Sequence, residues 1–348
     1  MTQTPAGPHD FAEAPAGGLA VGEAPLGEPG EEVAAPSGTA IIGRSPGQLA
    51  WIRLKRDRVA LVSGIVLLIM FVLAIAAPLI SKLYGSNATD QHSDLLDTSG
   101  YPLGYLGGIS GSHWLGLEPQ LGRDVLMQLI YGMRTSLVIA FVSAIITVAV
   151  GIIIGIIAGY AGGIVDSVLN WIIDLVLAFP FFIFCLAAIP VVTDAVYGSR
   201  GDVSALFRVG LIIAVFACFS WTYPARLVRG QVLSLREREF VEAARAAGAG
   251  MGHILFRQLL PNIWAPILVV FSLNVPSFIT GEAALSFLNI GVVEPTPDLG
   301  RMINNGTSFL QTDPFYTMVS GATILILVLA FNLFGDSVRD ALDPKSSR

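Results

Sequence analysis

Charged residues are scarce in this sequence. Asp, Glu, Lys and Arg make up 13% of its 348 residues, about half of the roughly 25% that is usual in a soluble globular domain. Hydrophobic residues account for 53%, and the mean hydropathy is +0.69. Too little polar surface remains to solvate a globule of this size, which excludes an ordinary soluble enzyme. The length instead accommodates six membrane-spanning helices of about 20 residues with their connections.

Cysteine and histidine are also rare, with two of the first and four of the second. Cys185 and Cys218 lie in apolar runs and the hydrophilic loops have none, so no disulfide is implied. Four histidines are too few for a metal framework, and none lies in a long apolar run. An intramembrane enzyme would need a serine–histidine pair or paired aspartates at membrane depth, and no such constellation is present.

The first forty residues lack lysine and arginine altogether, and contain six prolines, seven glycines and six acidic residues. Such a segment buries too little apolar surface to offset its chain entropy. It also lacks the positive start and apolar core of a signal peptide. We therefore predict a disordered acidic tail over residues 1–50 and a membrane domain over residues 51–348.

Six stretches with no charged residue, or only one, follow the tail. Each approaches the ~20 residues that a helix needs to cross a hydrocarbon layer of about 30 Å, and a helix satisfies its backbone hydrogen bonds without water. We predict an all-α membrane protein with six transmembrane helices, over Val59–Ile80, Thr135–Ile164, Ser167–Val192, Val209–Ala225, Gln258–Gly281 and Pro314–Gly335.

The positive residues are distributed unevenly between the connections. With the N-terminus inside the cell, fourteen of the twenty lysines and arginines fall in inside segments and six in outside segments. Because Lys and Arg concentrate on the cytoplasmic side, we predict that both termini are cytoplasmic. Residues 82–134 then form an extracellular loop, and residues 226–257 form a cytoplasmic loop.

Glycines recur every fourth residue in the second predicted span, at Gly151, Gly155 and Gly159. Residues four apart share a helix face, so these glycines form a groove that lets another backbone approach closely. The pattern predicts helix packing and does not identify a function.

The cytoplasmic loop at residues 226–257 is predicted to be largely helical. Ser234 and Glu237 have the spacing of a capping box, residues 236–247 are rich in helix formers, and Gly248 supplies a stop. A second short helix is expected near Gly252–Leu260. Such an elbow fits the groove of a partner protein, or equally lies on the lipid headgroups as an amphipathic connector.

The residues of this loop carry a family pattern. It reads Phe240-Val241-Glu242-Ala243-Ala244-Arg245-Ala246-Ala247-Gly248-Ala249, with Leu259-Leu260-Pro261 and Asn262 after it. Further motifs along the chain are His113-Trp114-Leu115-Gly116, Leu121-Gly122-Arg123-Asp124-Val125, Ala178-Phe179-Pro180 and Leu285-Ser286-Phe287-Leu288. Together, over about Leu54–Pro344, they resemble the C-type permease of the dipeptide/oligopeptide/nickel family of ABC importers, in which the loop is called the EAA loop.

The resemblance implies a type I ABC-importer permease fold with a cytoplasmic coupling helix between spans four and five. It assigns contact with an ATPase subunit to Glu242, Ala243, Ala244, Ala247, Gly248 and Pro261. Of these, Glu242 is expected to cap or pair locally, and Gly248 to let the chain reverse.

It also implies a non-catalytic transport subunit in the lipid of the bacterial plasma membrane. The partners implied are a second, homologous permease in a heterodimer, two ATPase subunits and an extracellular substrate-binding protein, without nucleic acid. The chain has no G-x-x-x-x-G-K-[ST] phosphate loop, so ATP and Mg are expected on the ATPase subunits and no cofactor or metal on this chain. Peptides are the expected substrate, and nickel or glutathione-like substrates are the alternative.

Polar residues in or near the predicted spans are candidates for the pathway or a gate, because polar groups at membrane depth are costly. They are Asp174, Asn274, Ser277, Thr280 and Glu282. For Asp174 we favour a structural hydrogen bond near the cytoplasmic end. Glu282 is expected at an outer gate or as a cap, and Pro266 and Pro276 are expected to bend or break span five.

The sequence does not assign a definite role to two segments on the predicted outer side. Ser81–Gly111 is longer than the family usually has, so the resemblance assigns it no role. Leu285–Asp313 is too polar to span. By the resemblance it is a surface near the binding protein, and otherwise it is a solvent-exposed loop.

A self-contained secondary transporter or channel is the competing class. It predicts intramembrane acid/base relays or inverted repeats with paired broken helices. Asp174 is a single charged residue in a predicted span and does not by itself form such a relay.

Overall fold

The computed structural model describes residues 46–198 and 201–343. The chain divides into two units, Met1–Gly43 and Arg44–Arg348, and the first lies outside the described residues. Most of the predicted tail over residues 1–50 is therefore not described. Helix α1 (Pro46–Arg56) begins within the last residues assigned to that tail.

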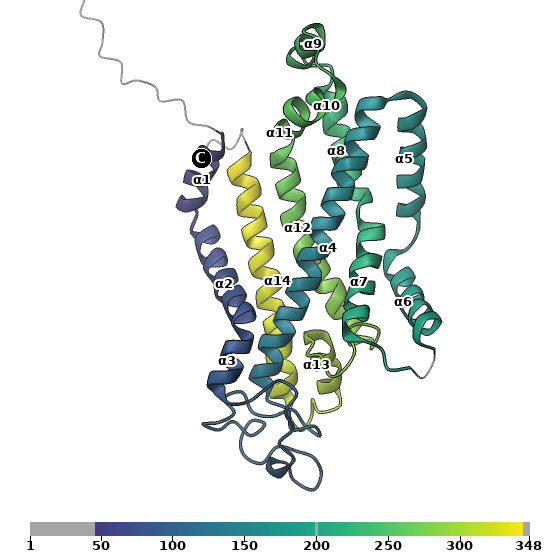
Figure 1. Ribbon diagram of the computed structural model, residues 1–348. Coiled ribbons are helices and arrows are strands. Elements are labelled where there is room, and N and C mark those ends of the chain that lie inside the picture. Colours follow the sequence, from purple (N-terminus) through teal and green to yellow (C-terminus); the bar gives the residue numbers. More distant parts are fainter. Residues whose placement is uncertain (1–45, 199–200, 344–348) are drawn as a thin grey trace, which may run out of the picture. The chain divides into compact units, whose positions relative to one another are not determined.

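The described residues form helices and loops, with three isolated β-bridges and no strand. Five helices among them are long and apolar enough to cross a membrane: α2 (Arg58–Ile75), α4 (Val125–Ala161), the joined pair α7 (Ala205–Ser220) and α8 (Thr222–Leu235), α12 (Trp264–Phe287) and α14 (Pro314–Leu342). The pair α5 (Gly163–Ala178) and α6 (Phe181–Tyr197) makes a sixth span if the two count as one. An all-helical membrane protein is thus confirmed, with five or six spans (Figure 1).

The third predicted span, Ser167–Val192, is not one helix. Helices α5 and α6 bend by 81° at a break between them. Phe179, at the break, has an extended backbone with ψ 131°. A residue before proline is disfavoured in the helical region, so Pro180 accounts for the interruption.

The first predicted span, Val59–Ile80, is also divided. Helix α2 ends at Ile75, and α3 (Ala77–Tyr84) begins after Ala76 with Pro78 in its first turn. Proline cannot donate the backbone hydrogen bond that would continue α2. In span five the expected break is absent, because α12 runs through Pro276 without interruption and has Pro266 in its first turn.

The longest helix, α4, has 37 residues and starts ten residues before the predicted span. Asp124 caps it by accepting from the Met127 amide at 2.9 Å. At 1.5 Å per residue the helix is about 55 Å long, so it extends beyond a bilayer core. It packs against α7, α8 and α12 and so lies at the centre of the bundle (Figure 1).

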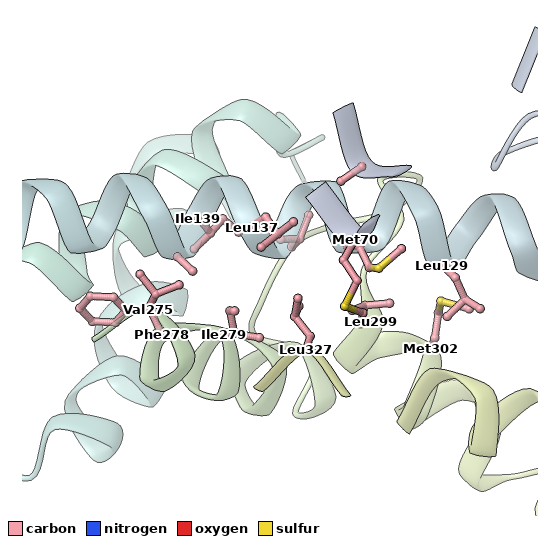
Figure 2. Close-up of a cluster of buried hydrophobic side chains, with 14 of the residues drawn as sticks. Met70, Leu129, Leu137, Ile139, Val275, Phe278, Ile279, Leu299, Met302 and Leu327 are labelled. Atoms are coloured by element: carbon pink, nitrogen blue, oxygen red, sulfur yellow. The ribbon is translucent and has the colours of Figure 1, made fainter. Parts of the chain in front are cut away.

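Two clusters of buried apolar side chains hold the bundle together. The first joins α2, α4, α12 and α14 through residues such as Met70, Leu137, Ile279 and Leu327 (Figure 2). The second joins α4, α8 and the start of α12, and includes Val241 of α9 (Glu239–Ala246). Because Val241 is fully buried, the short α9 is attached to the membrane bundle.

The two ends of the bundle differ. At one end Arg53 Nη1 of α1 donates to the Asp343 carbonyl at 2.8 Å, and α9 lies at this same end (Figure 1). We call it the elbow end. The opposite end carries the loop between α3 and α4 and the short helix α13 (Leu299–Thr307), and we call it the loop end.

Candidate functional site

The elbow, residues 236–253, contains α9, a glycine turn and α10 (Met251–His253). The predicted capping box is wrong, because Ser234 lies inside α8 and α9 begins only at Glu239, after Arg238 without a side-chain cap. Packing of Val232 in the second core cluster extends α8 past the serine. The second helix was expected near Gly252–Leu260, and α10 continues there into a π-helical turn over Ile254–Leu259.

Gly248 ends α9 in the left-handed region, with φ +79°. Its amide donates to the Arg245 carbonyl at 2.9 Å, and the Ala249 amide donates to the Ala244 carbonyl at 2.9 Å. This pair of bonds is a Schellman motif, which favours glycine at the residue after the cap. The chain reverses here as the sequence led us to expect.

The exposed face of α9 carries alanines beside acidic and aromatic side chains. Glu242, Ala243 and Ala247 are exposed, and Ala244 is half-buried. No hydrogen bond or ion pair is found for the Glu242 carboxylate among the described residues, so the expected local cap or pair is absent there. Alanines therefore make up much of this surface, and the Glu242 carboxylate is free on it.

The elbow is tied to the end of α4 by two arginines. The Arg245 guanidinium lies 5.4 Å from the centroid of the Tyr160 ring, a cation–π distance. Arg236 Nη1 donates to the Gly159 carbonyl at 3.0 Å. Together with buried Val241, these contacts attach the elbow to α4 and α8. Pro261, further on, is exposed in the turn α11 (Leu260–Asn262).

Gly151, Gly155 and Gly159 of α4 face α8. A Cβ on Gly151 would lie 2.5 Å from Cβ of Pro224, and one on Gly155 would lie 2.6 Å from the Ala225 carbonyl oxygen. One on Gly159 would lie 2.8 Å from Cβ of Val232. Only glycine allows this approach of the two helices, and α8 leads directly into the elbow.

Asp174 of α5 is half exposed and does not lie in a sealed core. It forms an ion pair with Arg226 of α8 and accepts from Asn170 Nδ2 at 3.0 Å. A second bridge joins the same two helices, with Arg229 Nη2 donating to Asp166 Oδ2 at 2.8 Å. The favoured structural role of Asp174 agrees with this geometry, because the two bridges clamp α5 to α8.

Glu282 near the end of α12 is completely buried. Its Oε2 accepts from Ser136 Oγ of α4 at 2.7 Å, and its Oε1 accepts from Ser286 Oγ at 3.0 Å. Ser286 Oγ also lies 2.9 Å from Oδ2 of Asp298, the cap of α13. Glu282 therefore joins α4, α12 and α13 inside the bundle and does not cap the next segment.

The remaining polar residues of α12 lie on its less buried side. Ser277 and Thr280 are exposed, and each donates to a carbonyl of its own helix. Asn274 is half-buried, and its Nδ2 is buried with no hydrogen-bond partner among the described residues. A buried amide without a hydrogen-bond partner is energetically costly.

A polar network at the loop end escaped the sequence analysis. Buried Arg123 donates from Nε to Glu118 Oε2 at 2.6 Å, and Tyr316 OH donates to Glu118 Oε1 at 2.8 Å. Burial opposes the charge of Arg123, but the hydrogen bond and charge of Glu118 outweigh it and raise the pKa of Arg123. Gln128 and Asn305 also donate to Glu118. The Leu-Gly-Arg-Asp motif marked this place, but Tyr316 and Asn305 lie too far along the chain to be found by pattern.

Asp124, which follows Arg123 in the chain, connects the loop between α3 and α4 to the bundle. Its Oδ2 lies 2.8 Å from His113 Nδ1 and accepts from Tyr84 OH at 3.1 Å. Burial raises the pKa of Tyr84 to about 12, so this hydroxyl stays protonated at physiological pH. Among residues 46–198 and 201–343, no group of three His, Cys, Asp or Glu side chains is arranged to hold a metal ion.

Comparison with known proteins defines the class. The family described as binding-protein-dependent transport system inner membrane component matches residues 151–348. The N-terminal transmembrane domain of oligopeptide transport permease C matches residues 45–97. The first match covers more than half of the chain, so the protein belongs to the binding-protein-dependent inner membrane components of ABC importers.

Within that class the chain is an importer permease of the DppC/OppC type, a multi-pass protein of the bacterial plasma membrane. The dipeptide transport system permease protein DppC of Alkalihalophilus pseudofirmus is 34% identical over 302 residues, which cover 86% of this chain and 90% of the relative. The glutathione transport system permease protein GsiD of Salmonella typhimurium is 36% identical over 302 residues, covering 87% and 91%.

Among solved structures, an inward-facing MetNI methionine ABC transporter is similar over 63% of this chain and 97% of that chain. It is 19% identical, with a TM-score of 0.49. A likeness of this size does not by itself define a fold.

Proposed function

We propose that this chain forms, with a second homologous permease in a heterodimer, the pathway by which di- and oligopeptides enter the cell. Two separate ATPase subunits bind ATP and Mg and drive the transport, and an extracellular binding protein delivers the substrate. The chain itself is non-catalytic and binds no cofactor. In this proposal the chain crosses the membrane six times, with both termini and the elbow in the cytoplasm.

The observation that carries this proposal is the construction of the elbow. Its outer face carries exposed alanines, its buried face includes Val241, and Arg245 lies against Tyr160 of α4. A small-residue surface lets a partner approach closely, as in a helix bound in a groove. Rigid attachment to α4 and α8 allows a displacement of the elbow to rock the bundle.

Asn274, Ser277 and Thr280 of α12 are our candidates for the pathway wall. They are the polar groups on the less buried side of a spanning helix, and the Asn274 amide lacks a partner. Polar groups that face a bundle interior or a water-filled cavity are typical of transport paths. Glu282 and Asp174 we assign instead to structure, because their partners lie within the chain.

The substrate proposal has one alternative with its own support. Relatives named for glutathione transport are as similar to this chain as those named for dipeptide transport. Glutathione is itself a tripeptide with a γ-linkage, so the same wall could accept both. Competition between labelled dipeptide and glutathione in uptake assays decides between them.

The coupling role is tested with Gly248→Asp and Glu242→Lys in the complex reconstituted with its ATPase subunits. We expect both variants to insert and assemble but to lose most ATP-driven uptake. Asp340→Lys, an exposed charge reversal in α14 outside the elbow, is the matched control and retains uptake. Cysteines at Ala243 or Ala247 should crosslink to an ATPase subunit, and labelling of this face from outside the cell would contradict the orientation.

A further inference from the structure

The loop between α3 and α4, residues 85–124, has a fixed shape at the loop end. The Leu103 amide donates to the Leu95 carbonyl at 2.8 Å, and the Leu117 amide donates to the Gly107 carbonyl at 2.8 Å. With Asp124 bound to His113 and Tyr84, as described above, the loop is a built surface rather than a simple connector. No role has been assigned to it so far.

Two large side chains stand out at the tip of this loop. Tyr105 is 90% exposed and Leu106 is 60% exposed. Leu106 has φ +49°, a conformation that is costly for a branched side chain and persists where the surroundings require it. Exposed apolar residues on a rigid surface outside the membrane are typical of protein contact sites.

A cleft of about 470 Å³ opens beside these two residues. One wall is formed by Asp97 and Tyr101 of the loop, and the other by Asp313 and Phe315 at the start of α14. Asp97 Oδ1 accepts from the Ser99 and Tyr101 amides, both at 2.8 Å. These bonds fix the exposed carboxylate at the rim.

Asp313 is the second acidic group of the cleft. Its side chain is largely buried, and its Oδ2 has no hydrogen-bond partner among the described residues. Burial raises its pKa, so a cation nearby would relieve the cost of its charge. Two carboxylates with aromatic walls suit an ammonium or guanidinium group.

The charge of the loop decides between a membrane and a protein as the occupant. Between Lys82 and Arg123 the sequence has no lysine or arginine, whereas Asp90, Asp94 and Asp97 are all exposed. Anionic lipid headgroups attract basic segments and repel acidic ones. A soluble protein with basic side chains is the complementary partner.

We propose that Tyr105, Leu106 and the cleft between Asp97 and Asp313 form a docking surface for the extracellular substrate-binding protein, which places a lysine or arginine side chain in the cleft. This inference rests on the proposed function, in which the loop end faces outward. The binding protein is the one soluble member of that assembly on this side. Tyr105 and Leu106 supply the apolar contact with the binding protein, and the acidic cleft fixes its orientation on the permease.

The test uses the complete transporter in nanodiscs with the binding protein that serves it. We expect Tyr105→Ala combined with Leu106→Ala, and separately Asp97→Asn, to raise the Kd of the binding protein about tenfold, as for central contact residues. Asp97→Asn keeps the oxygen that the two amides need. Ile109→Ala in the same loop but outside the cleft, and Asp202→Asn in the connection between α6 and α7, are the controls and stay within about twofold of the wild type.

Crosslinking identifies the occupant directly. In a Cys218→Ser background, which removes the exposed cysteine, Tyr105→Cys carries a benzophenone group. An adduct with the binding protein is expected. An adduct with lipid or with the second permease alone, or no adduct, overturns the docking surface.

Stimulation of ATP hydrolysis by the binding protein distinguishes a failure of the proposed function from a failure of the docking surface. If the wild type shows no stimulation, the proposed function fails. If stimulation and Kd remain at wild-type values in Asp97→Asn and in the Tyr105/Leu106 double variant, only the docking surface fails.

Discussion

Gly155 of α4 and Val228 of α8 lie so close that a Cβ on the glycine would be 2.8 Å from Cβ of the valine. The contact is one of three along the seam between these helices, and α8 continues toward the elbow. A displacement of α8 therefore has to move α4, the central helix of the bundle.

We expect Gly155→Val to loosen this seam. Overpacking of a close contact costs about 1–3 kcal/mol, and the branched side chain meets backbone as well as side-chain atoms. Thermal unfolding of the purified chain in detergent measures the loss. Gly210→Val in α7, where an added Cβ meets nothing within 4 Å, should leave the unfolding temperature nearly unchanged, and equal losses in both would contradict the seam.

Gly248→Ala is expected to strain the turn that ends α9. A residue with a Cβ costs about 1 kcal/mol at the positive φ found there. Gly248→Asn should be better tolerated, because asparagine enters this region more readily. Gly250→Ala is the control, with φ −69°, and ATP-driven uptake in proteoliposomes should fall in the order control, Asn, Ala.

Removal of the Ser337 hydroxyl should weaken the contact between the last part of α14 and the start of α2, by an amount that depends on pH. Ser337 Oγ donates to Asp57 Oδ2 at 2.6 Å, and this bond lowers the pKa of Asp57. A pKa lower in the folded state gives stability that is present above the unfolded value of about 3.9 and is lost as the pH falls through the folded value.

Ser337→Ala should therefore cost about 1 kcal/mol near neutral pH, with a difference that shrinks below about pH 4. Unfolding temperatures of both proteins across this range are the measurement. Ser167→Ala, which removes an exposed hydroxyl bonded within its own helix, should show no such dependence. If the loss of stability in Ser337→Ala does not change with pH, the proposed hydrogen bond from Ser337 to the ionised Asp57 carboxylate is contradicted.

Arg123→Ala should destabilise the loop end strongly. It leaves Glu118 buried without its charged partner, and breaking one side of a buried pair costs about 3–5 kcal/mol. The amount of folded protein in the membrane and its unfolding temperature should both fall. Lys82→Ala, an exposed cation near the same loop, should have little effect, and a similar small effect for Arg123→Ala would refute the network.

Asn274→Leu is expected to separate stability from transport. Its buried Nδ2 has no partner, and an unsatisfied buried polar group costs about 1–3 kcal/mol, so the variant should unfold at a higher temperature. If Asn274 lines the pathway, uptake should decrease at the same time. Ser277→Ala, whose hydroxyl is satisfied within its own helix, should not gain stability, and unchanged uptake in Asn274→Leu would remove Asn274 from the pathway.

The membrane class and most spans followed from hydropathy, because a bilayer requires long apolar helices whatever their packing. The break at Pro180 was also within reach, since the residue before a proline resists the helical region. The capping box at Ser234 failed because Val232 is held in the core and carries α8 onward. Pattern alone could not weigh that burial against a local cap.

Sequence alone determined that this chain lies in a membrane, that its glycines can form a close seam, and that residues 240–249 carry a family pattern, because these depend on local composition and spacing. Only the tertiary structure decided which helix fills the glycine seam and that Glu118 meets Tyr316, and it alone brought Asp97 to the same cleft as Asp313. These pairs are far apart along the chain, and packing of the whole bundle selects them.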